Sequence, residues 1–299
     1  MKKVQIIHNP VAGDEQHSRE KIIDWIHDGG FHGIYTSTSD DTWLEFKDEV
    51  DFLAIAGGDG TVRKVVMELL RQQKNNRWPI GLLPMGTANN IARSMGISEQ
   101  PQQVIAYWKE EVTKPFDVGF IQGANESNYF LESFGYGIFP YLIAEMKKLG
   151  KDNIDKTERK INEAQKLMHR IVIAYEPRYC ELTIDGTDHS GDFLMAEIMN
   201  TPTLGPNLNL SPLGDRGDGE FELILLPDQH REKFASYVEN RLHGKEDTYQ
   251  FHTLKGKDIL ISWKGTHVHV DDKVIKLEES QPINIQVIKG LVKFYVKSR

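Results

Sequence analysis

The sequence contains one cysteine, no long apolar run and no excess of basic residues. The lone Cys180 cannot form a disulfide within the chain, and its place before the strand-like ELTI favours a buried thiol in a reducing compartment. No segment approaches the ~20 apolar residues that span a bilayer, and the apolar run near the start is too short for a signal peptide. A net charge of −8 argues against a general nucleic-acid binder and leaves a local basic groove open. We therefore expect a cytoplasmic chain without a transmembrane segment or nucleic-acid partner.

The first 120 residues alternate strand and helix patterns. Apolar residues at i, i+3, i+4 and i+7 mark the clearest helix, over residues 61–72. This β-α-β-α order implies a parallel sheet covered on both faces, and therefore three layers. The expected strands are residues 3–8, 33–38, 51–56 and 78–84, and the expected helices are 18–30, 41–49, 61–72 and 88–95.

After about residue 118 the pattern changes to short strands and turns. A hairpin with Asp185-Gly186 at its bend is the clearest of these, and helical stretches interrupt near 141–170 and 228–242. The pattern predicts a β-sandwich. We expect two domains, an α/β domain over 1–118 and a β domain over 119–299. The sequence leaves open whether the last residues return to the first domain. It also leaves open a ligand-binding cleft between the two domains.

Three glycine-containing loops follow strands of the first domain: HNPVAG (8–13), GGDGT (57–61) and PMGTANNIARSMG (84–96). Taken alone, the first is no more than a strand-end turn. The second opens a helix, where free amides favour an anion, although Asp59 could be only a local cap. It lacks the Gly-Lys-Ser/Thr of a Walker A loop and departs from the Rossmann fingerprint at Arg63. Loops one βα unit apart meet at one sheet edge, where such folds bind ligands.

NPVAG, GGDGT and PMGTANNIAR, in this order and spacing, resemble the catalytic domain of diacylglycerol kinases and related bacterial lipid kinases. Sphingosine and ceramide kinases share this domain, and NAD kinases are distant relatives. The resemblance covers essentially the whole chain. It implies a three-layer α/β nucleotide domain followed by a β-sandwich, with the active site between them. It also implies transfer of the γ-phosphoryl group of ATP, with Mg²⁺, to a lipid hydroxyl.

The resemblance assigns nucleotide-binding residues in the first domain. Asp59 would act through Mg²⁺, directly or through water, so the carboxylate would face a metal that arrives with the phosphates. The implied nucleotide-binding residues are Asn9, Thr36, Gly57, Gly58, Asp59, Gly60, Thr61, Gly86 and Thr87.

A second metal site is implied by PLGDRGDGEFEL, which resembles a segment that holds a structural Mg²⁺ in this family. Asp218 would supply a carboxylate, and Asp215 and Glu220 would supply backbone carbonyls. A plain Asp218-Gly219 hairpin turn is the alternative.

The sequence departs from the family pattern at two places. The family has an Asp-Gly-Glu turn between two strands late in the chain, and the matching stretch here is VDDK. Asp271 stands at the aspartate position, while Asp272 replaces the glycine and Lys273 replaces the proton-accepting glutamate. A lysine ammonium cannot accept a proton at neutral pH, which leaves Asp271 or a shifted Asp272 to orient or deprotonate the hydroxyl. A plain solvated hairpin turn is the alternative. The second departure is Asn90, where the family has aspartate.

We therefore predict an ATP- and Mg²⁺-dependent lipid kinase that meets its lipid at a membrane surface as a peripheral protein, with a homodimer left open. The catalytic candidates are Asp271, Asp272 and Asp59. Two alternatives stay open: a nucleotide-binding homologue that does not catalyse, and a kinase of a soluble alcohol, as NAD kinase is. The pair His267 and His269 could bind a metal, although a surface strand is favoured because no third ligand is evident.

Overall fold

The structure is a computed structural model that describes residues 1–13, 17–74, 76–97, 100–124, 128–148, 157–206, 208–212, 214–245 and 251–298. The chain divides into two compact units. Unit 1 comprises residues 1–116 and 290–299, and unit 2 comprises residues 117–289. Each unit has its own hydrophobic interior and is described by itself.

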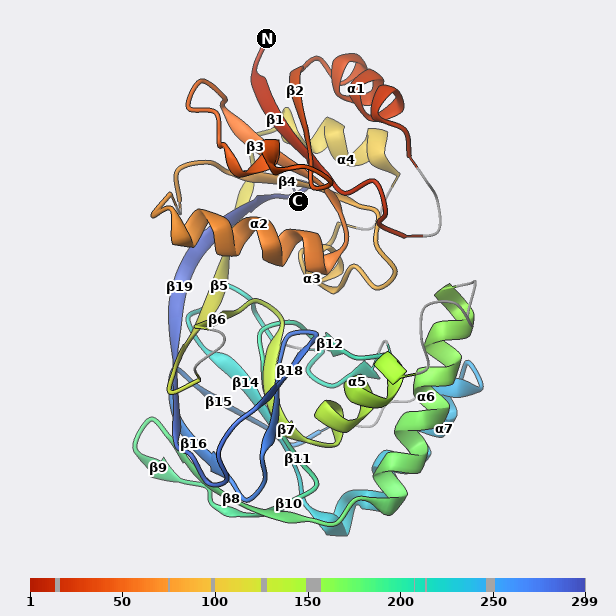
Figure 1. Ribbon diagram of the computed structural model, residues 1–299, viewed down its shortest axis with the longest axis vertical. Helices are drawn as coiled ribbons and strands as arrows, with labels where there is room; N and C mark the ends of the chain where they lie inside the picture. The colour runs from red at the N-terminus through yellow and green to blue at the C-terminus, as the bar shows by residue number, and fades with distance from the viewer. Residues whose placement is uncertain are drawn as a thin grey trace. The chain divides into compact units, whose positions relative to one another are not determined.

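Unit 1 is built on a parallel sheet with the strand order β4-β3-β1-β2, joined at β4 by the end of β19. The α1 and α4 helices cover one face, and α2 covers the other (Figure 1). The three-layer α/β fold expected from the sequence is confirmed. The elements are β1 (Lys3–His8), α1 (Arg19–Asp28), β2 (His32–Ser37), β3 (Phe52–Gly57), α2 (Asp59–Arg71), β4 (Ile80–Pro84), α3 (Asn90–Ser94), α4 (Pro101–Trp108) and β19 (Ile283–Tyr295).

One expected helix of unit 1 does not form. Residues 41–49 contain only a 3₁₀ turn, Asp41–Leu44. The buried side chain of Gln5 explains the difference. Its amide donates to the Glu45 carbonyl at 3.1 Å, and its oxygen accepts from the Lys47 amide at 2.9 Å. A side chain distant in sequence thus takes the backbone groups that a longer helix would pair.

Unit 2 contains an antiparallel six-stranded sheet with the order β15-β14-β11-β7-β17-β18. A second set of antiparallel strands has the order β10-β8-β16-β19. Tyr136 and Trp263, one from each sheet, stack at a ring distance of 5.7 Å in the interior. The C-terminal antiparallel sheets are consistent with the expected β-sandwich. The strands are β7 (Ser133–Gly137), β8 (Arg178–Ile184), β10 (Gly191–Phe193), β11 (Met195–Met199), β14 (Phe221–Leu226), β15 (Thr253–Gly256), β16 (Asp258–Trp263), β17 (His267–Val270) and β18 (Lys273–Lys276).

Three helices belong to unit 2: α5 (Ile138–Lys148), α6 (Thr157–Ala174) and α7 (Arg231–Leu242). The remaining short strands are β9 (Thr187–Asp188), β12 (Thr203–Leu204) and β13 (Leu208–Asn209), while β5 (Thr113–Gln122) begins in unit 1 and pairs with β6 (Tyr129–Phe130) in unit 2.

Two local predictions for unit 2 are confirmed. The predicted hairpin turn Asp185-Gly186 joins β8 and β9, and both residues have positive φ, as tight hairpins require. Cys180 is fully buried, and burial raises the pKa of its thiol to about 12.

Candidate functional site

The three loops singled out in the sequence meet in unit 1. The Asn9 side-chain amide, after β1, donates to the Thr61 hydroxyl at 3.0 Å. Gly58, after β3, and Gly86, after β4, approach each other backbone to backbone. All three loops follow the carboxyl ends of neighbouring parallel strands, so the sheet itself brings them together.

The contact between the second and third loops requires glycine on both sides. A Cβ on Gly86 would lie 2.4 Å from the Gly58 Cα, and a Cβ on Gly58 would lie 2.8 Å from the Gly86 Cα. Asn89 holds the third loop closed: its oxygen accepts from the Gly86 amide, and its nitrogen donates to the Gly86 carbonyl, both at 2.8 Å. Glycine is therefore required at both positions for the two loops to pack this closely.

Asp59 links the second loop to the third through hydrogen bonds that the sequence did not indicate. Its two carboxylate oxygens accept from the backbone amides of Asn90 and Ile91, each at 2.9 Å. Burial raises the pKa of Asp59, while these amides and the charge of Arg93 act in the opposite direction. The carboxylate therefore caps the start of α3. Because the Asn90 backbone makes this bond, the bond does not require the Asn90 side chain.

The other nucleotide-site candidates differ in accessibility. Gly60 and Thr87 are exposed, and a Cβ on Gly60 would meet no atom within 4 Å. Gly57 packs against Thr61, which is itself buried. Thr36 is buried in β2 and donates its hydroxyl to the Ile6 carbonyl at 2.8 Å. A nucleotide contact by Thr36 stays a prediction, and it would have to use the oxygen lone pairs.

The VDDK segment forms a hairpin turn between β17 and β18 in unit 2, with Val270 paired to Lys273. Asp271 is only 5% exposed, so the turn differs from a plain solvated one. Its carboxylate accepts from the successive backbone amides of residues 131–133, the shortest bond being 2.7 Å from Glu132. Asp272 and Lys273 are exposed beside it.

A buried ionisable pair lies directly behind this turn, and the sequence reasoning missed it. His269 and Glu197 are both fully buried, with Nε2 and Oε2 2.8 Å apart. The other ring nitrogen of His269 lies 2.9 Å from the Asp271 carbonyl oxygen. The expectation that His269 lies on a surface strand is therefore wrong. Gly135 makes the pair possible, because a Cβ there would lie 2.2 Å from the Glu197 carboxylate.

The sign of the pKa shifts in this pair follows from its surroundings. Burial raises the pKa of Glu197, and His269 opposes that shift. Burial by itself would lower the pKa of His269, but the charge of Glu197 and the hydrogen bonds outweigh it, so the pKa is raised. Within the described residues, the Glu197 Oε1 atom has no hydrogen-bond partner. The signal that the sequence did offer was Gly135, a glycine inside an apolar strand.

The structural magnesium site stays a prediction, and the Asp218 carboxylate assigned to it already has protein partners. One carboxylate oxygen of Asp218 accepts from the Glu220 amide at 3.0 Å, and the other lies 3.0 Å from the Lys255 ammonium. The Asp218 carbonyl accepts from Lys289 at 2.8 Å, while Asp215 accepts from the Gly217 amide. Mg²⁺ demands close octahedral oxygen ligands, and adjacent ammonium groups repel it. The described residues contain no group of three or more His, Cys, Asp or Glu side chains placed to hold a metal.

A metal that arrives with a nucleotide fits the first site better. The two Asp59 oxygens accept from the Asn90 and Ile91 amides, and because a carboxylate has about four lone-pair sites, Asp59 could also accept from a metal-bound water. At the start of α2, no side chain of the described residues forms a cap hydrogen bond, and the Thr61 and Val62 amides donate to the Gly58 carbonyl at 2.9 and 3.1 Å. The arrangement suits a phosphate group together with its cation.

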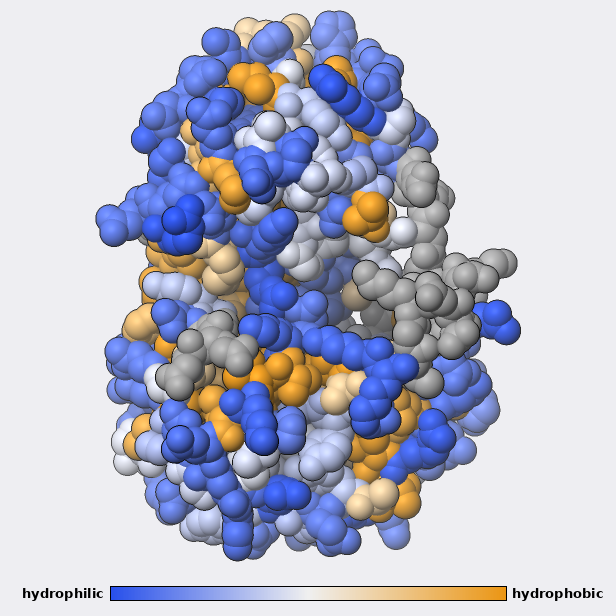
Figure 2. Space-filling view, in the orientation of Figure 1, coloured by the Kyte–Doolittle hydropathy of each residue, from blue (hydrophilic) through white to orange (hydrophobic). Residues whose placement is uncertain are grey.

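Among the described residues, no helix is long and apolar enough to cross a membrane. Figure 2 shows hydrophobic surface on unit 2 between hydrophilic side chains. The large apolar side chains of unit 2 that are exposed, within its described residues, are Tyr141, Ile173, Tyr179 and Leu260.

Comparisons with known proteins agree with the motifs. Residues 3–121 match the family model described as the diacylglycerol kinase catalytic domain. A diacylglycerol kinase from Bacillus subtilis strain 168 is 25% identical over an alignment of 257 residues that covers 82% of this chain and 80% of that protein. The family resemblance inferred from the loops is thereby confirmed.

Solved structures show the same fold. A diacylglycerol kinase structure from Bacillus anthracis strain Sterne aligns with a TM-score of 0.72 at 22% identity, covering 99% of this chain and 97% of that one. An NAD kinase from Archaeoglobus fulgidus, solved in complex with ATP, aligns with a TM-score of 0.53 at 10% identity, covering 99% and 94%.

Proposed function

We propose that this protein is a lipid kinase that transfers the γ-phosphoryl group of ATP to a lipid hydroxyl. The observation that carries the proposal is the glycine-to-glycine contact of Gly58 and Gly86 at the strand ends, within the region that matches the diacylglycerol kinase catalytic domain. The kinase names of the relatives support a phosphotransferase, and the ATP-bound NAD kinase of similar fold supports ATP as the donor.

In this proposal the loops of unit 1 bind the triphosphate. The exposed Gly60, in the first turn of α2, offers its amide to a phosphate oxygen, and the exposed Thr87 reaches the phosphates from the third loop. Asn9 orients the Thr61 hydroxyl, and Asp59 sets the start of α3. Magnesium bound with the nucleotide would neutralise charge on the transferring group.

The acceptor hydroxyl is assigned to the Asp271 turn, with separate roles for its two carboxylates. Asp271 is a positioning residue, because its carboxylate is buried and accepts from the amides of residues 131–133. Asp272 is the exposed carboxylate of the turn and takes the proton from the hydroxyl. Lys273 stands where the family's proton acceptor would be, so this assignment replaces that glutamate by its neighbour.

The test supplies labelled ATP and Mg²⁺ with a panel of diacylglycerol, sphingoid base, other lipids and NAD. We expect label in a lipid, and loss of at least about a hundredfold in kcat for Asp272→Asn. Glu279→Gln is the matched control, because it removes the charge of an exposed carboxylate elsewhere in the same unit. It should keep wild-type activity.

Other outcomes would redirect the proposal. Labelled NAD without labelled lipid would favour a kinase of a soluble alcohol. Nucleotide binding with no product on any substrate would favour a non-catalytic homologue. This is the second candidate function, because the Asp271 carboxylate is already hydrogen-bonded to backbone amides and Lys273 stands in place of the proton acceptor.

A further inference from the structure

The buried pair of Glu197 and His269 crosses neighbouring strands of the six-stranded sheet in unit 2. Gly135 on β7 is the register partner of Glu197 on β11 and also of His269 on β17. Residues directly opposite each other in antiparallel strands share one face of the sheet. The two side chains therefore meet over the glycine, where a Cβ would lie 2.2 Å from the Glu197 carboxylate. The pair ties the strand that leads into the Asp271 turn to a strand inside the sheet.

The hydrogen bonds of His269 determine where its protons lie. Its Nδ1 atom lies 2.9 Å from the Asp271 carbonyl oxygen, and a carbonyl oxygen can only accept, so Nδ1 carries a proton. Its Nε2 atom lies 2.8 Å from Oε2 of Glu197, and this contact holds one further proton, on the ring or on the carboxyl group. In both cases Nδ1 donates to the turn. Glu197 thus fixes the orientation of the ring and directs its other nitrogen to the Asp271 backbone.

The Asp271 backbone adopts a conformation that needs support. Its φ of 53° lies in the left-handed region, which residues other than glycine seldom adopt. Its amide donates to the Ser133 carbonyl at 2.8 Å, and its carbonyl accepts from His269. That carbonyl belongs to the peptide group that joins Asp271 to Asp272. His269 therefore holds the peptide group from which Asp272 projects.

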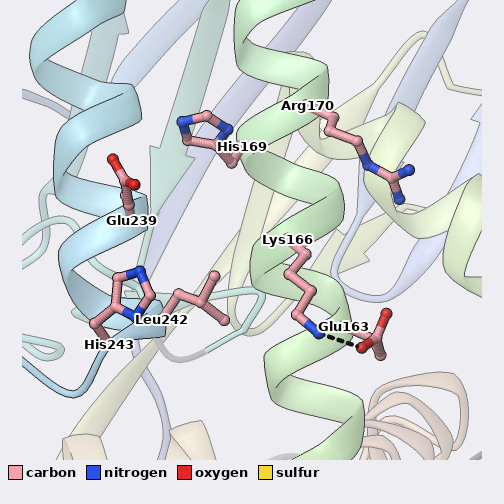
Figure 3. A pocket seen from close by; sticks show the side chains of 7 residues that line it. All are labelled: Glu163, Lys166, His169, Arg170, Glu239, Leu242 and His243. Carbon is pink, nitrogen blue, oxygen red and sulfur yellow. Dashed lines mark hydrogen bonds and ion pairs between the residues drawn. The ribbon is translucent and has the colours of Figure 1, made fainter.

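An ion pair at the surface of unit 2 shows how an ordinary pair differs. Figure 3 shows Lys166 and Glu163 on α6, beside a cavity of about 420 Å³ between α6 and α7. Their charged atoms lie 2.8 Å apart and both side chains are half-exposed, so the pair contributes little to stability. Glu197 and His269 instead lose all contact with water, a cost that two well-packed apolar side chains would avoid. Stability alone does not explain the buried pair, and its contact with the turn supplies another reason for it.

We propose that His269, oriented by Glu197, is a positioning residue for phosphoryl transfer, whose Nδ1–H holds the Asp271–Asp272 peptide group in the orientation that Asp272 needs. This inference rests on the proposed function, in which Asp272 takes the proton from the acceptor hydroxyl. Both members of the pair are fully buried, so they act through the turn and not on the substrate. A proton acceptor works only within hydrogen-bond reach of its proton, so a loosened turn lowers kcat and leaves nucleotide binding intact.

Two double variants isolate the donor to the turn. Glu197→Leu/His269→Leu removes the pair together with the donor. Glu197→Leu/His269→Asn also removes the pair, but asparagine has nearly the shape of leucine, and its amide nitrogen takes the place of Nδ1. We expect the first variant to lose about tenfold or more in kcat with an unchanged KM for ATP, and the second to recover most of the wild-type kcat. A purely structural role predicts the opposite order, because leucine suits a buried position better than asparagine does.

Hydrogen exchange of the Asp271 amide supplies a readout that needs no catalysis. This amide donates to the Ser133 carbonyl, and we expect it to exchange about tenfold faster in the leucine double variant than in the asparagine one. If the leucine double variant does not fold, His269→Gln takes its place, because its longer amide reaches Glu197 and not the turn.

The outcomes separate this inference from the proposed function. Wild-type kcat in the leucine double variant would overturn the positioning role, and so would equal losses of kcat in both double variants. A wild-type protein that labels no substrate would instead count against the kinase. The exchange measurement would then decide alone, and equal exchange of the Asp271 amide in the two variants would overturn the role of His269.

Discussion

The glycine loops of unit 1 and the Asp271 turn of unit 2 are held in place by different physical means. The loops are held by tight backbone contact, with Gly58 against Gly86, by the neutral side-chain amide of Asn89, and by the Asp59 carboxylate on two backbone amides. The turn is held by charge, with the carboxylate of Asp271 on three amides and the buried pair Glu197–His269 behind it. The comparison teaches that the loops should be sensitive to added volume, and the turn to lost or altered charge.

The largest expected effect comes from removing one member of the buried pair. His269→Ala leaves Glu197 fully buried without its partner, so we expect a loss of about 3 to 5 kcal/mol in the free energy of unfolding. Denaturant titration measures it. The matched variant Glu197→Leu/His269→Leu removes both groups and should lose much less. Equal losses in the two variants would show that the volume of the side chains matters at this position and their charge does not.

Adding one methyl group to the loop contact tests the other side of the comparison. Gly86→Ala places a Cβ 2.4 Å from the Gly58 Cα, which forces the two backbones apart. We expect a loss of about 1 to 3 kcal/mol in stability and a clear loss of ATP binding, measured by calorimetry. Gly60→Ala, where nothing lies within 4 Å, is the control and should keep its stability. A Gly86→Ala variant that binds ATP normally would contradict the close-approach argument.

The pH dependence of stability should differ between wild type and the variant without the buried pair. Both Glu197 and His269 have raised pKa values, so the folded state binds more protons than the unfolded state. Stability therefore falls as pH rises through the folded pKa values, by up to about 1.4 kcal/mol per pH unit for each proton released. Thermal unfolding across the pH range measures it, and Glu197→Leu/His269→Leu should lack this slope. A wild-type protein whose stability rises with pH over the same range would reverse the assignment.

The smallest expected effect has the opposite sign and belongs to unit 1. Burial, followed by the charge of His17, lowers the pKa of His8, whose ring nitrogen lies 2.8 Å from the Tyr35 hydroxyl. The folded state disfavours the charged His8 ring. The stability that neutral His8 contributes is therefore lost as pH falls below the ordinary histidine pKa of 6.5. In a plot of unfolding free energy against pH, His8→Gln should reduce the slope on the acid side. An unchanged slope there would contradict the assigned role of His8.

Much of the fold could be predicted because its signals are local. The alternation of strand and helix, the hairpin at Asp185-Gly186 and the three glycine loops each lie within a short run of residues. The helix expected over 41–49 failed for the reverse reason, since Gln5 competes for its backbone from 40 residues away. Aspartates 59, 218 and 271 were all identified in the sequence, but not the partners that determine what each can do.

Sequence patterns were sufficient for the loops because a strand end, a glycine and a helix start are properties of neighbouring residues. The electrostatics came from tertiary structure alone. Asp59 meets the Asn90 amide 31 residues on, Lys255 reaches Asp218 across 37 residues, and His269 reaches Glu197 across 72. A charge is stabilised or destabilised by whatever folding brings within a few ångströms of it, whatever the separation in sequence. The order of the residues therefore located the candidate site, and the folded arrangement determined which of its carboxylates remain exposed enough to act.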